Sequence, residues 1–188
     1  SLNRIMKKIK NNTKIDILLS QYSFASYVGN KGEISKMVGV DHDEPYEEKY
    51  ISDILKNVKT IAMVGASNDK TKFSYGVLRV LHETGYEMLP VNPTLRGLKI
   101  RGLKVYPSLI SINKKVDMVQ VFRKSEDLPT VAKEAVEIGA KVLWGQIGVK
   151  HPEAAIIAEN AGMKVVMNRC PKIELFRPFW KPKLNLKL

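Results

Sequence analysis

Short apolar runs alternate with stretches of helical periodicity along most of the chain. The apolar runs predict strands over residues 60–66, 86–91, 117–122, 141–144 and 164–167, with a short strand or turn at 105–109. Apolar residues at helical spacing predict helices over about 50–58 and 75–84, and within 125–139 and 152–162. Strands that alternate with helices in this way form a parallel sheet covered on both faces. We therefore predict an α/β fold of three layers, with a mostly parallel sheet of five to six strands and helices on both faces.

The chain divides into three segments by charge and pattern. Residues 1–45 are a basic N-terminal extension, and residues 1–40 carry 7 basic and 2 acidic side chains. The basic amphipathic pattern at its start is compatible with an organelle transit peptide and equally with a solvated tail. Residues 46–180 form the predicted domain, and 181–188 form a basic C-terminal tail. We expect a cytoplasmic protein, or one of the mitochondrial matrix if the extension is a transit peptide.

Composition and charge narrow the class of function. The 188 residues are 44% hydrophobic, which allows a sizeable core, but no apolar run reaches the roughly 18–20 residues that cross a bilayer. Cys170 is the single cysteine, so no intrachain disulfide is possible, and the histidines show no metal-ligand spacing. The net charge of +12 favours anionic ligands. Its lysines are dispersed and no RNA-binding aromatic motif is present, so nucleic acid stays an alternative partner and not the expected one.

The turn after the first predicted strand indicates a phosphate site. Small residues there let the backbone approach an anion, and the N-terminus of the next helix favours negative charge. The hydroxyl and amide side chains that follow can bind phosphate oxygens, and two lysines add positive charge. The residues expected at this site are Gly65, Ala66, Ser67, Asn68, Lys70, Lys72, Ser74 and Tyr75. The turn matches neither the GxGxxG fingerprint of dinucleotide binding nor a Walker loop.

The ends of the later strands supply further candidates. In open parallel sheets, ligands bind beyond the carboxyl ends of the strands, where the strand order reverses. The candidates there are Asn92, Pro93, Val121, Phe122, Arg123 and Gln146. Ser125 is expected to cap the helix that follows the 117–122 strand. Cys170 lies between two cationic residues and is either a reactive thiol or a buried, inert cysteine.

The residue after the second strand distinguishes between nucleotide ligands. A dinucleotide dehydrogenase holds the ribose 2′-hydroxyl with an acidic residue there, and this chain has Asn92 instead. That difference counts against NAD. Arg96 and Lys99 are compatible with a ribose 2′-phosphate, so an NADP-dependent oxidoreductase of the Rossmann type stays open. We predict no catalytic residue, because the strand ends carry no Ser/His/Asp set and no carboxylate pair.

A string of motifs gives the chain a resemblance to a known family. In order they are VGAS, FSYGV, PVNP, VYPSL, VDMVQVFR, LWGQIGV and VVMNRCPKIE. They resemble the CoA-binding domain family related to the bacterial YccU-type proteins, over about residues 46–175. The family is similar to the N-terminal domain of the succinyl-CoA synthetase α subunit. Phe73 departs from the pattern, because many relatives carry proline at this position.

The resemblance implies a Rossmann-like fold that holds coenzyme A or an acyl-CoA. It places the phosphates at the turn of Gly65, Ala66 and Ser67, and the candidates at the other strand ends along the nucleotide and the pantetheine arm. The synthetase also needs a second domain, for which nothing in this sequence after residue 180 provides a match. We therefore expect a non-catalytic, stand-alone binding module. A homodimer, the acyl group and the pathway stay open.

Overall fold

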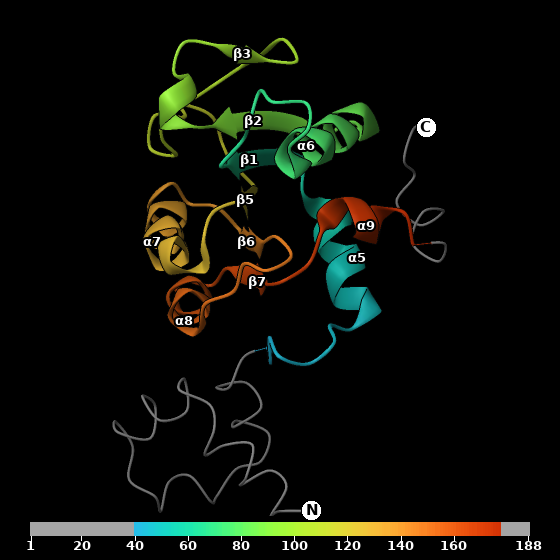
Figure 1. Ribbon diagram of the computed structural model, residues 1–188. Helices are drawn as coiled ribbons and strands as arrows, with labels where there is room; N and C mark the ends of the chain where they lie inside the picture. Colours follow the sequence, from blue (N-terminus) through green and yellow to red (C-terminus); the bar gives the residue numbers. More distant parts are fainter. Residues whose placement is uncertain (1–39, 178–188) are drawn as a thin grey trace, which may run out of the picture. The chain divides into compact units, whose positions relative to one another are not determined.

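The computed structural model describes residues 40–177 (Figure 1). The chain divides into two units, Ser1–Glu44 and Pro45–Leu188. Of the first unit the structure describes residues 40–44, where the Glu44 amide donates a hydrogen bond of 3.4 Å to the Asp41 carbonyl. Residues 1–39 of the predicted N-terminal extension and the basic tail predicted at 181–188 lie outside the described residues. The roles of both segments and the domain limits stay predictions.

A parallel sheet of five strands forms the centre of the second unit. The strands are β1 (Thr60–Val64), β2 (Glu87–Val91), β5 (Met118–Val121), β6 (Val142–Gly145) and β7 (Lys164–Val166). Their order across the sheet is β2-β1-β5-β6-β7, and every neighbouring pair is parallel. Each strand overlaps a predicted apolar run, and the predicted α/β fold is confirmed.

Helices cover both faces of the sheet, as predicted (Figure 1). On one face lie α7 (Leu128–Glu137) and α8 (Pro152–Asn160). On the other lie α5 (Glu48–Asn57), α6 (Phe73–Thr84) and the short α9 (Pro171–Leu175). Helix α6 ends where Gly85 takes a φ of 110°, the left-handed conformation that glycine adopts without strain. Because all five strands run in the same direction, every βα turn lies at one edge of the sheet.

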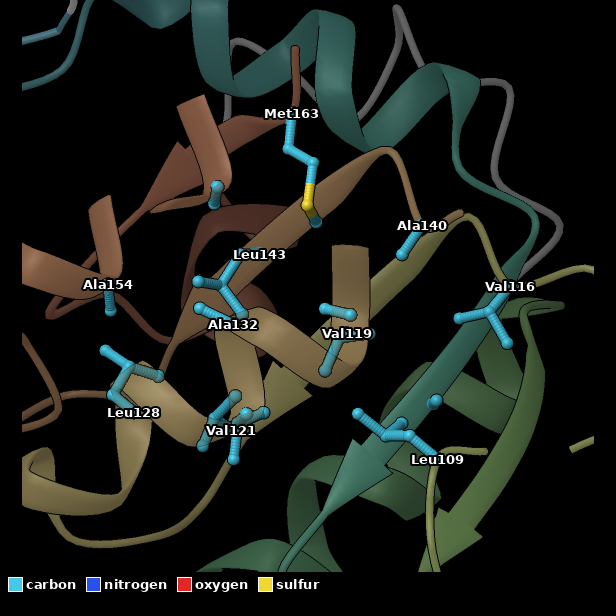
Figure 2. Close-up of a cluster of buried hydrophobic side chains, with 14 of the residues drawn as sticks. Leu109, Val116, Val119, Val121, Leu128, Ala132, Ala140, Leu143, Ala154 and Met163 are labelled. Carbon is cyan, nitrogen blue, oxygen red and sulfur yellow. The ribbon is translucent and has the colours of Figure 1, made fainter. Parts of the chain in front are cut away.

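Two apolar clusters fill the spaces between the sheet and its helices. Val119 and Val121 of β5 point into the cluster beneath α7 and α8, together with residues such as Leu128 (Figure 2). Met118 belongs to the second cluster, beneath α5, α6 and α9. Successive side chains of a strand point to opposite faces, so Gln120 shares the face of Met118. The strand thus places one polar side chain in an otherwise apolar layer.

The segment after β2 contains structure that the sequence pattern did not predict. A 3₁₀ turn, η1 (Pro93–Leu95), leads to an antiparallel hairpin of β3 (Lys99–Ile100) and β4 (Leu103–Lys104). Arg101 and Gly102 have φ angles of 52° and 81°, as a two-residue primed turn requires. The predicted short strand or turn at 105–109 contributes one parallel bridge, between Tyr106 and Val91.

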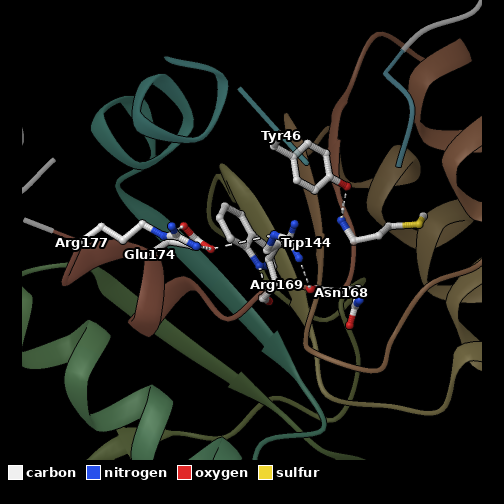
Figure 3. A network of polar contacts seen from close by, with 7 residues as sticks. Tyr46, Trp144, Asn168, Arg169, Glu174 and Arg177 are labelled. Atoms are coloured by element: carbon white, nitrogen blue, oxygen red, sulfur yellow. Dashed lines mark hydrogen bonds and ion pairs between the residues drawn. The ribbon is translucent and has the colours of Figure 1, made fainter. Parts of the chain in front are cut away.

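Two tyrosines close the outer edge of β7. The Tyr50 hydroxyl donates to the Val165 carbonyl and accepts from the Val165 amide, both at 3.0 Å. The Tyr46 hydroxyl accepts from the Met167 amide at 2.7 Å (Figure 3). Burial raises the pKa of Tyr50 to about 12 and also raises that of Tyr46, so both remain neutral donors or acceptors. These backbone groups at the edge of β7, which could pair with another strand, are therefore already hydrogen-bonded.

Candidate functional site

The strand order reverses between β1 and β5. From β1 the chain crosses to β2 on one side, and from β5 it continues to β6 on the other. The turns after β1 and β5 therefore meet closely, with Gly65 against Phe122. A Cβ on Gly65 would lie 2.3 Å from the Phe122 carbonyl oxygen, and its φ of 82° is left-handed. Glycine is needed here for both reasons.

The first residues of the turn after β1 are bound to the end of β2. The amides of Gly65 and Ala66 donate to the Val91 carbonyl at 3.0 and 3.4 Å. The Asn92 side chain donates from Nδ2 to the Ala66 carbonyl at 2.8 Å, and its Oδ1 accepts from the Thr94 backbone amide and hydroxyl. These three predicted site residues hold the two strand ends together. Their predicted contacts with a ligand stay predictions.

Beyond Ala66, the β1 loop (residues 65–72) is shaped by its own side chains. The Ser67 hydroxyl accepts from the Asp69 amide at 3.1 Å. The Asp69 carboxylate accepts from the Thr71 hydroxyl at 2.7 Å and from its amide at 2.9 Å. These bonds hold the pKa of Asp69 below its usual value, with the hydroxyl as the larger cause. The acidic side chain is thereby directed back into its own loop.

The β1 loop and the first turn of α6 offer donors to an anion. Within the described part of the chain, the Ser67 and Asn68 amides have no acceptor, and helix geometry leaves the amides of Phe73 and Ser74 without an intrahelical one. Lys70 and Lys72 are exposed and form no ion pair with a described residue. Unused amides, a helix N-terminus and unpaired cations together suit a phosphate group. The structure thus gathers most of the predicted phosphate residues.

A second loop at the same edge, the β6 loop (residues 146–150), is bonded to neighbours on both sides. The Ser125 hydroxyl donates to the Gly148 carbonyl and accepts from the Lys150 amide, both at 3.1 Å. From the β7 side, the Asn168 side chain accepts from the Gly148 amide at 2.8 Å. The prediction of Ser125 as a helix cap is wrong, because neither η2 (Ser125–Asp127) nor α7 has a side-chain cap. Its hydroxyl instead fixes the β6 loop.

Two buried glutamines meet beneath this edge. Gln120 of β5 is fully buried, and its amide nitrogen donates to the Gln146 side-chain oxygen at 3.2 Å. The Gln120 oxygen has no hydrogen-bond partner among the described residues. Gln146 was predicted at the site, whereas Gln120 was missed. A glutamine within an otherwise apolar strand was the signal that could have identified it.

The remaining predicted residues lie in different environments. Val121 points into the apolar cluster beneath α7 and α8, away from the α6 side. Phe122 and Tyr75 are half-buried against the other cluster. Arg123 is directed to Asp127 by an ion pair of 3.1 Å. The structure also leaves Pro93 exposed, at the first position of η1. The α6 side of the edge therefore holds more of the predicted site than the α7 side.

Cys170 belongs to the apolar cluster beneath α5, α6 and α9, and its neighbours in the chain form a polar network at the end of β7. The thiol residue is 4% exposed and precedes α9. Beside it, the Arg169 carbonyl accepts from the Trp144 indole at 2.8 Å, and the Arg169 side chain lies 4.0 Å from the buried Glu174 carboxylate (Figure 3). Glu174 also pairs with Arg177 at 2.8 Å. The thiol is buried and forms no disulfide, and its predicted reactivity stays a prediction.

Residues 40–177 contain neither a candidate metal site nor a candidate membrane span. No group of three or more His, Cys, Asp or Glu side chains within that range could hold a metal ion. No helix within it has the length and apolar character that a membrane span requires. The cellular compartment stays a prediction.

A family model described as a CoA binding domain matches residues 59–175. That range contains all five strands of the parallel sheet and both loops at its carboxyl edge. The motifs that carried the resemblance in the sequence all fall inside it. The match to a CoA-binding family is therefore confirmed at the level of the domain.

Similar proteins cover the same domain. The chain is 40% identical over 123 residues to the uncharacterized protein YneT of Bacillus subtilis (strain 168), covering 65% of this chain and 90% of that protein. It is 32% identical over 126 residues to the α subunit of the ADP-forming acetate–CoA ligase I of Pyrococcus furiosus, covering 60% of this chain and 27% of the subunit. A solved structure of a hypothetical protein from Pyrococcus horikoshii OT3 has a TM-score of 0.67 at 34% identity, covering 72% and 96% of the two chains. The matches thus cover most of YneT and of the Pyrococcus horikoshii protein, and about a quarter of the ligase subunit.

Proposed function

The chain belongs to the CoA binding domain family, and from this premise we propose that it binds coenzyme A or an acyl-CoA as a stand-alone module, without catalysing a reaction. In the proposed complex, the diphosphate lies against the β1 loop and the first turn of α6. The other strand ends line the nucleotide and the pantetheine arm. The observation that carries this proposal is the group of unused amides and unpaired lysines at the β1 loop.

Charge and position support this placement. Coenzyme A carries a diphosphate and a ribose 3′-phosphate, and the N-terminus of a helix attracts such groups through its amides and its dipole. The loop presents Lys70 and Lys72 to solvent, while Asp69 is bonded within the loop. The site also lies at the reversal of strand order, where open parallel sheets bind nucleotides.

The proposal of binding without catalysis has its own support. The ligase subunit named above is matched over 27% of its length, so most of that subunit has no match in this chain. YneT is matched over 90% of its length, so one relative consists of little more than this domain. The carboxyl edge of the described sheet brings together amides, lysines and glutamines, and no nucleophile paired with a base.

Calorimetric titration with a set of ligands tests the proposal. The purified chain is titrated with CoA, acetyl-CoA and NADP at one ionic strength. We expect CoA or acetyl-CoA to bind at least about tenfold more tightly than NADP, a difference of about 1.4 kcal/mol. Tighter binding of NADP would contradict the proposal and favour the oxidoreductase alternative.

Two further ligands address the remaining alternatives. A single-stranded RNA oligonucleotide that outcompetes CoA at physiological salt would favour a nucleic-acid function for this basic chain. Incubation with acetyl-CoA, ADP and phosphate tests for the reaction that the ligase relative is named for. We expect no acetate and no ATP, and their formation would show that the module is an enzyme.

A further inference from the structure

The buried Gln120 side chain has an unpaired polar atom. Gln120 is 0% exposed, and its Oε1 lacks a partner among the described residues. Its Nε2 is used by Gln146 Oε1 at 3.2 Å. Turning both amides over would pair Gln120 through its oxygen and leave its nitrogen unpaired. The pair therefore leaves one polar group of Gln120 without a partner in either orientation, although buried polar groups are nearly always bonded.

The surroundings of Gln120 make this arrangement costly. Its register neighbours are Met63 on β1 and Trp144 on β6, and both belong to the apolar cluster beneath α5, α6 and α9. An apolar side chain of similar size would fit the same layer without an unpaired atom. A polar group retained at a cost to stability is typical of a functional position.

The position of the pair points towards the ligand edge. Gln120 is the second-last residue of β5, and Gln146 directly follows β6. Gln146 is 9% exposed and Gln120 is fully buried, so Gln146 is the member of the pair that reaches the solvent. Within the described part of the chain, no acceptor is bonded to the Gln146 Nε2. The pair thus keeps one donor and one acceptor for a molecule that enters from that edge.

We propose that Gln120 and Gln146 form a receptor for the amide groups of the pantetheine arm. This inference rests on the proposed function. The arm of CoA contains two secondary amides, and each offers one N–H and one C=O. The Gln146 Nε2 donates to a ligand carbonyl, and a shift of the Gln146 side chain lets the Gln120 Oε1 accept from a ligand N–H. The nucleotide half of CoA carries no such amide and is held at the β1 loop.

A double variant separates this role from a structural one. In Q120L/Q146L both amides become apolar groups of similar size, which removes the unpaired atom together with the pair. We expect CoA to bind about tenfold more weakly, whereas adenosine 3′,5′-bisphosphate, which lacks the arm, keeps its affinity within about twofold. The melting temperature is expected to stay level or rise, because no buried polar atom is left unpaired. A matched control is M118L, a buried apolar exchange on the same face of β5.

Three outcomes would overturn the inference, and each leaves the proposed function standing. They are CoA binding unchanged in the double variant, an equal loss for both ligands, and a fall in melting temperature well beyond that of M118L. A measurement on the unmodified chain needs no variant to fold. The chain has three glutamines, and we expect CoA, but not adenosine 3′,5′-bisphosphate, to shift the side-chain amide signals of Gln120 and Gln146. Failure of CoA to bind the unmodified chain would instead contradict the proposed function itself.

Discussion

Two loops at the carboxyl edge of the sheet differ in what holds them. The β6 loop is bonded from both sides, by Ser125 after β5 and by Asn168 after β7. The β1 loop beyond Ala66 is held by bonds among its own residues, chiefly through Asp69. Residues 68–73 are exposed, whereas the β6 loop includes the buried Gln146 and Val149.

The difference suggests a division of work between the loops. A segment bonded to its neighbours keeps its shape when a ligand arrives, and it serves as a fixed wall. A segment held by few long-range contacts belongs to the low-stability end of the structure, where binding loops are usually found. We therefore propose that the β1 loop binds the anion and that the β6 loop supports the site. The predictions below test this assignment.

The largest effect is expected at the glycines where the loops begin. A Cβ at Gly65 would lie 2.3 Å from the Phe122 carbonyl oxygen, and a Cβ at Gly145 would lie 2.3 Å from that of Val149. Gly65 also has a φ of 82°. We expect G65A to lower the free energy of unfolding by about 3 kcal/mol and G145A to lower it by about 2 kcal/mol. The loss is larger in G65A because alanine at position 65 would also be strained by the left-handed backbone. Urea unfolding measures both, and an equal or smaller loss in G65A would contradict this account.

The next effect concerns the bond that fixes the β6 loop. Asn168 has a φ of 56° and accepts from the Gly148 amide at 2.8 Å. We expect N168A to lower the unfolding free energy by about 2 kcal/mol. The variant loses the acceptor for the Gly148 amide, and alanine adopts the left-handed backbone less readily than asparagine. N168G keeps the backbone conformation and isolates the lost acceptor. The counterpart S67A, in the β1 loop, is expected to cost less than about 1 kcal/mol. A larger loss in S67A than in N168A would remove the distinction between the loops.

The lysines of the β1 loop are expected to affect binding and not folding. We predict that K70A/K72A weakens CoA binding about tenfold, or about 1.4 kcal/mol, through loss of charge-assisted bonds to phosphate. Its unfolding free energy should stay within about 0.5 kcal/mol of the parent, because both side chains are exposed. The control K133A/K141A removes the same charge from exposed sites elsewhere. Equal weakening in both variants would indicate general charge attraction and not a site.

The smallest effect is a pH dependence on the β7 side, beside the fixed loop. The pKa of Tyr50 is raised to about 12 by burial, above the ordinary value of about 10. Its contribution is fully present below pH 10 and is lost as the pH rises from 10 to 12, because the unfolded chain releases the proton first. We expect a loss of about 1 kcal/mol between pH 9 and pH 11.

The variant Y50F supplies the control for this pH dependence. It removes the titrating hydroxyl and both bonds to Val165. We expect Y50F to lower the unfolding free energy by about 1 kcal/mol at pH 8. Above pH 10, the unfolding free energy of Y50F should fall less steeply with pH than that of the parent. Equal slopes for the parent and Y50F would show that Tyr50 does not control the stability of this edge.

The sequence predicts the sheet well because its signals are local. Five apolar runs bounded by glycine and polar residues mark five buried strands, and Gly85 ends α6 where expected. Three short elements, β3, β4 and α9, were missed for a physical reason. Strands β3 and β4 have two residues each, and α9 has five, which is too short for a periodic pattern to develop.

The candidate site is harder to predict because its details depend on tertiary partners. Topology alone places the turn of Gly65 at the carboxyl edge of the sheet, where the strand order reverses, and the fold agrees. The choice between capping a helix and bonding to another loop is invisible in the sequence, so the prediction for Ser125 was wrong. Gln120 was missed because its apolar neighbours indicate only a buried strand. The lack of a partner for its side-chain oxygen can be recognised only in the folded structure.

The assignment of phosphate binding to the β1 loop is tested most directly by amide chemical shifts. Labelled protein is titrated with CoA, and backbone ¹H–¹⁵N signals are followed. We predict the largest shifts at the unused amides of Ser67, Asn68, Phe73 and Ser74, with much smaller shifts at Gly148 and Lys150, whose amides are already bonded. Saturable binding with its largest shifts in the β6 loop, and none between residues 67 and 74, would contradict the assignment.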